Sequence, residues 1–533
     1  MLHFTKRIKF SRKGWLLTLL FLLAVVLIPV FTILLRAFEP SGNSWNLITE
    51  FFLSRYIWNS LGLSLGVGSL CLIFGVLPAW LVSNFDFPGR KWLKLGLLFP
   101  LSIPTYIMAY TYTGIFDSTG TVQHYVAAWF GQATANAMYF DSMNPYFLTV
   151  LLAFCLYPYV YSACLISFSS GSSRQLEAAS SLGSTAMSRF FRVGLPLAKP
   201  ALFTGLFLVI MEVLNEYGAV QYFNIKTLTT GIFTAWENGD LNSAVRVALI
   251  LLMIAMLFLL LSKWLKGKQK ITTSTKTPIL RRKLSGSKGI LAMTFCFSLF
   301  LFSFFIPFIQ LLAWSTIAYK GVVLEGFASM AGNTCLVSFV AAVIITMVAF
   351  LLLFAGNLLQ SIGGRKLAAL GLLGYSIPGA IIAVGIIIPF VFLDTTFGSD
   401  VLLGTVTGLV IAYLIRFLSV SYGPLKGAFE RQGSRLDEAS LSLQSRPVKT
   451  LFKVHLPLLQ PAFIMAIILV FVDVMKELPM TLILRPMNYD TLATEAYRYA
   501  QTNESAVQAA PFSILLILIG IIPILVLSKL IKR

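Results

Sequence analysis

Long apolar runs recur along the whole chain and are separated by short polar segments. Each run reaches about 20 residues, the length that an α-helix needs to cross roughly 30 Å of hydrocarbon. In the first half of the sequence the runs are Trp15–Leu35, Trp58–Val82, Trp92–Phe116, Tyr146–Phe168, Ala201–Tyr222 and Ala244–Leu265. In the second half they are Ile290–Trp314, Thr334–Ala355, Leu367–Phe392, Val401–Tyr422, Pro461–Leu484 and Pro511–Leu530. The pattern predicts an all-α polytopic membrane protein with about 12 transmembrane helices.

Composition and charge agree with this prediction. The chain of 533 residues is 57% hydrophobic and 12% charged, with a net charge of +20. Its basic residues cluster at 6–13, 263–283 and 529–533, and twelve spans that start inside place all three clusters in the cytoplasm, as the positive-inside rule requires. Residues 117–145 contain no Lys or Arg. The charge therefore indicates a multi-pass cytoplasmic-membrane protein with both termini inside, in contact with lipid and not with nucleic acid.

A sequence repeat relates the two halves. The segment Glu177–Ala201 reappears 261 residues later as Glu438–Ala462, and 12 of the 25 aligned positions are identical without a gap. Because each half holds an even number of spans, the halves are predicted to be parallel six-helix repeats. We assign residues 1–265 to the first repeat, 266–289 to a basic cytoplasmic linker and 290–533 to the second repeat.

Both copies of this segment lie in the loop before the fifth span of their half, at 170–200 and 430–461, which the topology places in the cytoplasm. The first copy predicts one short helix that ends at Gly183 and a second that begins after Ser184. In the second copy Gln444 replaces the glycine and Pro447 opens the second helix. A solvated loop or a helix on the lipid surface is the alternative, which two matched copies make less favourable.

This duplicated loop resembles the EAA motif of the permeases of bacterial binding-protein-dependent ABC importers. In that family a short coupling helix of the loop docks on the ATP-hydrolysing subunit. The resemblance assigns the ATPase-coupling positions to Glu177, Ala178, Gly183, Glu438 and Ala439. It implies an inner-membrane permease that works by alternating access.

The chain carries no ATP-binding motif of its own. The pattern GxxxxGK[ST], whose backbone cradles phosphates, does not occur in the sequence. The longest outer loop, at 117–145, is too short to capture a substrate. The expected partners are therefore two copies of a cytoplasmic ABC ATPase, which bind ATP and magnesium, and a separate extracytoplasmic binding protein. No enzymatic activity, catalytic residue or cofactor is expected in this chain.

The fifth apolar run of each half carries a pair of acids. Glu212 and Glu216 lie four residues apart and hence on one helical face, and the positions 261 residues later are Asp473 and Glu477. Acids inside a span are costly and usually face the bundle interior or a water-filled path. They are candidates for the translocation path. Alternatively their role is structural, with Glu477 paired with Lys476 or capping a broken helix.

The segments that follow these acids are distinctive. They are Glu216–Phe223 and Thr229–Trp236 in the first half, and Lys476–Pro486 and Asp490–Thr494 in the second. Both pairs resemble the corresponding segments of the ferric-iron importer permeases, a fused two-half branch of the ABC family. This resemblance, and not the spacing of the residues, implies iron as the cargo.

The chemistry of these segments is compatible with Fe³⁺, a hard cation that favours oxygen ligands. The four carboxylates, with Tyr217 and Tyr222, could supply such oxygens. No stable metal site is expected, because tight binding would slow release of the cargo.

Other functions fit parts of the sequence. The same machine could carry thiamine, phosphonate, sulfate or a polyamine, since those permeases share the fold and the loop. An ion-coupled secondary transporter would use the acids as proton sites, but the duplicated cytoplasmic loop argues against it. A membrane enzyme would need clustered catalytic groups or metal ligands, and none is found.

Overall fold

The computed structural model describes most of the chain. The residues outside the description are 1, 41, 43, 171–174, 176–178, 180, 267–280, 319–323, 360–362, 399, 433–439, 441–446, 502–505 and 532–533.

The described residues form an all-α membrane protein, as predicted. Eleven helices are long and apolar enough to cross a membrane, or twelve if the bent pair Arg90–Ser102 and Thr105–Phe130 counts as one span. These twelve segments correspond in order to the twelve predicted runs. The strands found in the described part are β1 (Phe85–Asp86) and β2 (Arg282–Lys283), a parallel pair of two residues each.

The chain divides into two compact units that do not coincide with the sequence halves. Unit 1 comprises Met1–Asn43, Ala235–Leu252 and Leu324–Thr494, and unit 2 comprises Ser44–Thr234, Met253–Val323 and Glu495–Arg533. The chain passes from one unit to the other at 43/44, at 323/324 and within three helices, α13 (Leu228–Glu237), α14 (Leu241–Lys266) and α25 (Leu492–Gln501).

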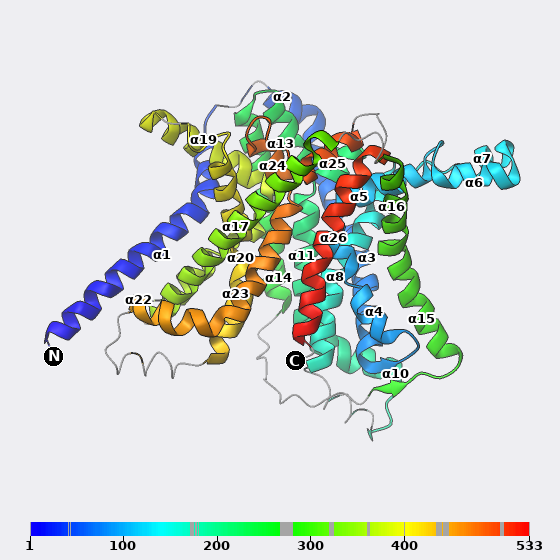
Figure 1. The fold of residues 1–533 in the computed structure, drawn as a ribbon, viewed down its shortest axis with the longest axis horizontal. Coiled ribbons are helices and arrows are strands. Elements are labelled where there is room, and N and C mark those ends of the chain that lie inside the picture. Colours follow the sequence, from blue (N-terminus) through cyan, green and yellow to red (C-terminus); the bar gives the residue numbers. More distant parts are fainter. Residues whose placement is uncertain are drawn as a thin grey trace. The chain divides into compact units, whose positions relative to one another are not determined.

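Unit 2 is built around three spans, α3, α8 and α11, which pack on one another (Figure 1). Its helices from the first half are α2 (Trp45–Leu47), η1 (Ile48–Phe52), α3 (Leu53–Asn84), α4 (Arg90–Gly96), η2 (Phe99–Ser102), α5 (Thr105–Phe116), α6 (Thr121–Phe130), α7 (Gln132–Ala137), α8 (Pro145–Ser170), α10 (Ala186–Arg189), η3 (Phe190–Gly194), α11 (Leu195–Asn215) and α12 (Gly218–Tyr222). A β-carbon at Gly205 of α11 would lie 2.8 Å from Val160 Cα of α8. Glycine thus lets these spans approach closely, as small residues do in membrane interiors.

Helices of the second half complete unit 2. They are α15 (Ser287–Phe300), η4 (Leu301–Phe305), α16 (Ile306–Ala318) and α26 (Ala506–Ile531). Helix α15 packs on α4, and α16 packs on both α5 and α26. The first and last spans of the second half therefore lie against spans of the first half.

Unit 1 repeats the three-span core with α17, α20 and α23. Its helices are α1 (Leu2–Arg36), α17 (Leu324–Leu358), α18 (Gly364–Leu370), η6 (Leu373–Ser376), α19 (Gly379–Phe397), α20 (Val406–Gln432), α22 (Pro447–Thr450), η7 (Leu451–His455), α23 (Leu456–Met475) and α24 (Pro479–Leu484). The first span of the chain, α1, packs on α19 and α17. At Gly385 of α19 a β-carbon would lie 2.7 Å from the carbonyl oxygen of Pro29 in α1, so these two backbones nearly touch.

The structure refines four predicted runs. The third run of each half is divided, into α4, η2 and α5 and into α18, η6 and α19, and each fifth span is interrupted near its end. The run predicted to reach Tyr222 ends as α11 at Asn215, and the run predicted to reach Leu484 ends as α23 at Met475. A short helix, α12 or α24, follows each break. Non-helical backbone at membrane depth is tolerated only where its polar groups find partners within the protein, and those partners define the site described next.

Candidate translocation and coupling sites

Glu216 lies at the break in the first fifth span. Helix α11 ends at Asn215, and Glu216 has an extended backbone with ψ 123°. Its carboxylate accepts a hydrogen bond from the Ala219 N–H at 2.9 Å and another from the Thr105 hydroxyl of α5. Glu216 therefore caps the N-terminus of α12 and joins it to the third span.

Glu477 has the same position in the second half and a denser set of partners. One carboxylate oxygen accepts the Met480 N–H at 3.1 Å, and the other accepts the Thr481 N–H at 3.1 Å and the Thr481 hydroxyl at 2.9 Å. The Tyr413 hydroxyl lies 2.6 Å from the Thr481 hydroxyl. Glu477 is only 6% exposed, and the buried guanidinium of Arg416 acts on it electrostatically. It caps α24 as Glu216 caps α12.

The other two fifth-span acids do not take part in these caps. Glu212 is half-buried on α11. Asp473 is also half-buried, and its carboxylate lies 3.8 Å from the Lys476 ammonium. Lys476 thus pairs with Asp473, and the described contacts of Glu477 are those of a helix cap. The structure separates the four predicted carboxylates into two capping residues and two that lie on the span itself.

The two candidate tyrosines have different surroundings. Tyr217 is buried, and its ring stacks on Phe233 with the centroids 3.6 Å apart. The ring of Tyr497 lies 6.0 Å from that of Tyr217. The Tyr222 hydroxyl accepts a hydrogen bond of 3.1 Å from Thr113. Among the described residues no group of three or more His, Cys, Asp or Glu side chains could hold a metal ion.

A pair of threonines starts the helix that follows α12. The Thr230 hydroxyl accepts the Thr227 N–H at 2.8 Å and donates to the Thr227 carbonyl at 2.9 Å. The next N–H, of Leu228, donates to the Ser60 hydroxyl of α3 at 3.0 Å. This capping arrangement satisfies the first N–H groups of α13 and fixes them to the second span.

The second half repeats this arrangement at the start of α25. The Thr494 hydroxyl accepts the Thr491 N–H at 2.9 Å, and the Leu492 N–H donates to the Thr334 hydroxyl of α17 at 2.8 Å. The repeated sequence is Thr-Leu-x-Thr. This signal is visible in the sequence, but the candidate site residues predicted from the sequence do not include it. Its hydroxyls give the duplicated segments a common structural role.

Helix α25 also contains an ion pair. Glu495 is buried, and the Arg498 Nε donates to its carboxylate at 3.0 Å. The bond and the charge of Glu495 raise the pKa of Arg498. The guanidinium also lies 4.6 Å from the centre of the Tyr499 ring. The buried charge of Glu495 is thereby neutralised.

The coupling loop is described in part. Glu177, Ala178, Glu438 and Ala439 lie outside the described residues. Gly183 has a φ of +77°, and the Ser184 N–H donates to the Ala179 carbonyl at 3.1 Å. This is the left-handed helix end predicted at Gly183.

A second helix begins two residues after this turn, also as predicted. The Thr185 hydroxyl accepts the Ser188 N–H at 3.2 Å and so caps α10, which starts at Ala186. In the second half α22 starts at Pro447, as predicted. From these starts the helices run into the fifth spans, and a π-helical turn lies at the matching positions Phe190–Gly194 and Leu451–His455.

Comparison with known proteins accounts for the duplicated architecture. The family described as "binding-protein-dependent transport system inner membrane component" matches residues 72–269 and 353–533. The chain is 27% identical to the Fe(3+)-transport system permease protein FbpB 2 of Haemophilus influenzae, over 97% of this chain and 98% of that protein.

Two shorter relatives match about half of the chain or less. The molybdenum transport system permease protein ModB of Escherichia coli is 28% identical over 39% of this chain and 93% of its own length. The sulfate transport system permease protein CysT of Salmonella typhimurium is 27% identical over 45% of this chain and 87% of its own length. With the family signature present twice, the chain belongs to the inner-membrane components of binding-protein-dependent transport systems, as a permease with two fused halves.

Proposed function

We propose that this permease imports Fe³⁺ across the bacterial cytoplasmic membrane. The observation that carries the proposal is the similarity to an Fe(3+)-transport permease over 97% of the chain. The sulfate and molybdenum permeases match over 45% and 39% of the chain. Those two cargoes are the competing assignments.

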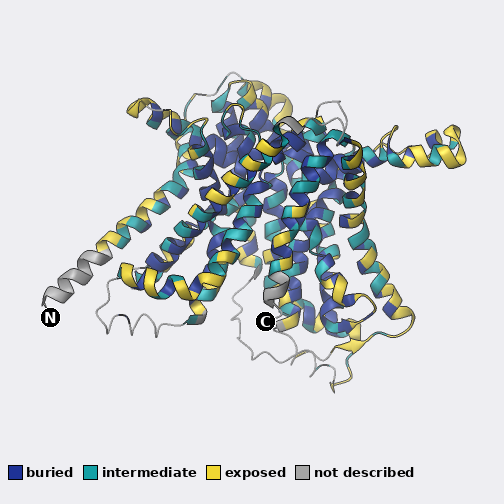
Figure 2. Ribbon diagram, in the orientation of Figure 1, coloured by how far each residue is buried: buried dark blue, intermediate teal, exposed yellow. Residues whose placement is uncertain are grey.

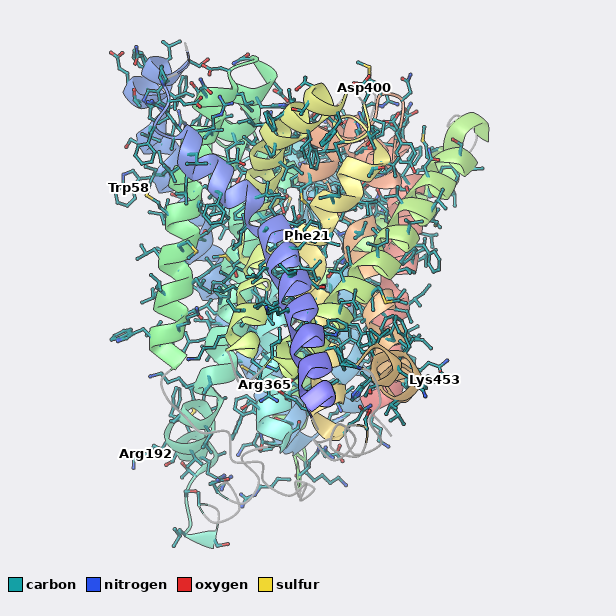
Figure 3. All side chains as sticks on the ribbon, turned by 90° about the vertical axis from the view of Figure 1, so that its left-hand side faces the viewer. Phe21, Trp58, Arg192, Arg365, Asp400 and Lys453 are labelled. Carbon is teal, nitrogen blue, oxygen red and sulfur yellow. The ribbon has the colours of Figure 1, made fainter. Side chains whose placement is uncertain are left out.

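The proposed partners are two copies of a cytoplasmic ABC ATPase and an extracytoplasmic binding protein. Around the Gly183 turn Leu182 is 87% exposed and Met187 is 69% exposed, so apolar side chains are available to a docking subunit. Within unit 1, Figure 3 places Arg365 and Lys453 at one end and Asp400 at the opposite end. Within unit 1 this polarity supports a cytoplasmic side for the second coupling loop and for the N-terminal end of α1.

Motion of the ATPases would reach the fifth spans through continuous helix. The segment Ala186–Asn215 runs without a break from the coupling loop to the Glu216 cap, and Pro447–Met475 runs in the same way to the break at Glu477. A segment of 30 residues is about 45 Å long. Movement of either coupling helix would therefore shift the capped break at the far end. We assign alternating access to this linkage, with Glu212 and Asp473 along the route of the cargo.

Uptake of labelled cargo tests the proposal. In cells with this chain deleted and then restored, radioactive Fe³⁺ uptake should depend on the chain and persist with excess unlabelled sulfate and molybdate. Radioactive sulfate and molybdate uptake should be equal in the two strains. If the restored chain brings back sulfate or molybdate uptake instead of iron uptake, the cargo is reassigned. As a control for the competition experiment, excess unlabelled Fe³⁺ should reduce the uptake of radioactive Fe³⁺.

A further inference from the structure

The hairpin formed by α6 and α7 has no part in the proposed transport route. It follows α5 directly, and within unit 2 it extends away from the packed spans (Figure 1). Helix α6 packs on α7 and on the end of α5. Much of the hairpin surface is exposed (Figure 2). Its side chains are therefore available to whatever surrounds the permease at this level.

Helix α6 carries an apolar stripe. Val122, Tyr125, Val126, Trp129 and Phe130 recur at the spacing of one helical face. Trp129 is 76% exposed, Phe130 is 66% exposed and Tyr125 is 54% exposed. Large aromatic rings are thus presented outward in a row that the rest of unit 2 does not cover.

The hairpin lacks the charges that keep a water-facing surface soluble. Residues 118–140 contain no Asp, Glu, Lys or Arg. The chemistry of the stripe is that of the aromatic belt at a membrane boundary, where amphipathic rings are enriched. A partner protein recognised by charge would find no complementary group here.

Both ends of the hairpin lie at ends of membrane spans. Phe116 ends α5, and its ring lies 5.8 Å from that of Phe147 in the first turn of α8. The ring of Phe140, which follows α7, also lies 5.6 Å from the ring of Phe147. Tyr146, at the start of α8, is 85% exposed. The exposed aromatic surface therefore continues from the hairpin onto the exposed first residues of a span.

We propose that α6 lies in the outer lipid–water interface, with Tyr125, Trp129 and Phe130 inserted among the lipid headgroups and upper acyl chains. The occupant of the stripe is the phospholipid surface itself. Because the hairpin has no Lys or Arg, insertion depends on apolar area and not on attraction to anionic lipid. The hairpin thereby fixes the outer end of α5, the helix whose other end holds Thr105 against Glu216.

Spin labels at two positions of α6 test this proposal in the full-length chain. Trp129→Cys places a nitroxide on the stripe, and His124→Cys places the matched control on the opposite face of the same helix. Four of the five native cysteines are buried and Cys335 is half-buried, so the unsubstituted chain, treated in the same way, gives the background. Each variant is reconstituted in phosphatidylcholine vesicles, and the access of oxygen and of a water-soluble nickel chelate is measured.

The label at 129 should be reached by oxygen more than by the chelate, at a depth of about 5–10 Å, and the label at 124 should show the reverse. Addition of phosphatidylglycerol or salt should leave both results unchanged. Equal access of the chelate to the two labels would overturn the proposal, because it would place the stripe in water, where a protein could bind it.

Discussion

Replacing Glu477 by alanine is expected to reduce Fe³⁺ uptake to near background and to lower the melting temperature of the purified permease. The substitution removes the acceptor of the Met480 and Thr481 N–H groups and of the Thr481 hydroxyl. Each buried donor left unsatisfied costs about 1–3 kcal/mol. The loss also leaves the buried guanidinium of Arg416 without this neighbouring negative charge, which adds to the cost.

Two further variants calibrate this effect. Glu477→Gln keeps one carbonyl acceptor and is expected to be intermediate in both uptake and melting temperature. Glu216→Ala is expected to be milder than Glu477→Ala, because Glu216 is half-buried and has one backbone donor in place of two. A Glu477→Ala permease with wild-type melting temperature and uptake would contradict the assigned cap.

Substitution of Gly183 by valine is expected to uncouple transport while membrane insertion stays normal. Gly183 has a φ of +77°, a conformation that a β-branched residue rarely adopts. The cost of about 1–2 kcal/mol shifts the equilibrium of the turn away from its native form by about 5- to 30-fold. This turn precedes the helix that continues to Asn215. Uptake should therefore fall in proportion to the loss of the native turn. The measurements are Fe³⁺ uptake and the amount of permease in the membrane fraction.

Gly239 provides the matched control. Its φ is +73°, and among the described residues, apart from its chain neighbours, an added β-carbon would meet no atom within 4 Å, as at Gly183. It lies between α13 and α14, away from the coupling loop, so Gly239→Val introduces the same strain elsewhere. If both variants lose uptake equally, the defect comes from backbone strain in general and not from the coupling turn.

The sequence predicts the spans well because their signal is local. An apolar run of about 20 residues indicates a membrane helix regardless of which helices pack against it. The end of a helix at Gly183 and the start of another at Pro447 are local signals of the same kind, and the structure confirms both. The partners of the spans carry no such signal. That α1 packs on α19 depends on contacts such as Gly385 against Pro29, which are over 350 residues apart in sequence.

The interruptions of the fifth spans could be suspected from the sequence but not located. Glu212 and Glu216 look equivalent there, since both are acids on one helical face. Their separate roles depend on tertiary contacts: Glu216 meets Thr105 of another helix, and Glu477 is joined through Thr481 to Tyr413. Nothing in the spacing of the acids identifies these hydroxyl partners.

The α6 hairpin is a different case, because its pattern is visible in the sequence. Positions 122, 125, 126, 129 and 130 follow the helical period, although residues 117–145 can be interpreted simply as an outer loop. In such permeases, a helical period of apolar residues within an outer loop therefore indicates an amphipathic helix and not an irregular loop.

Fe³⁺ uptake by the Glu212→Gln/Asp473→Asn permease tests most directly whether the duplicated fifth spans carry the cargo. The variant leaves both helix caps intact but removes the carboxylate that pairs with Lys476. Its membrane level should therefore match the wild type, and its melting temperature should fall less than that of Glu477→Ala. Uptake should be restored to the deletion strain by the wild-type chain and should fall toward the deletion level with the variant. Wild-type uptake by the variant would contradict a route along these carboxylates.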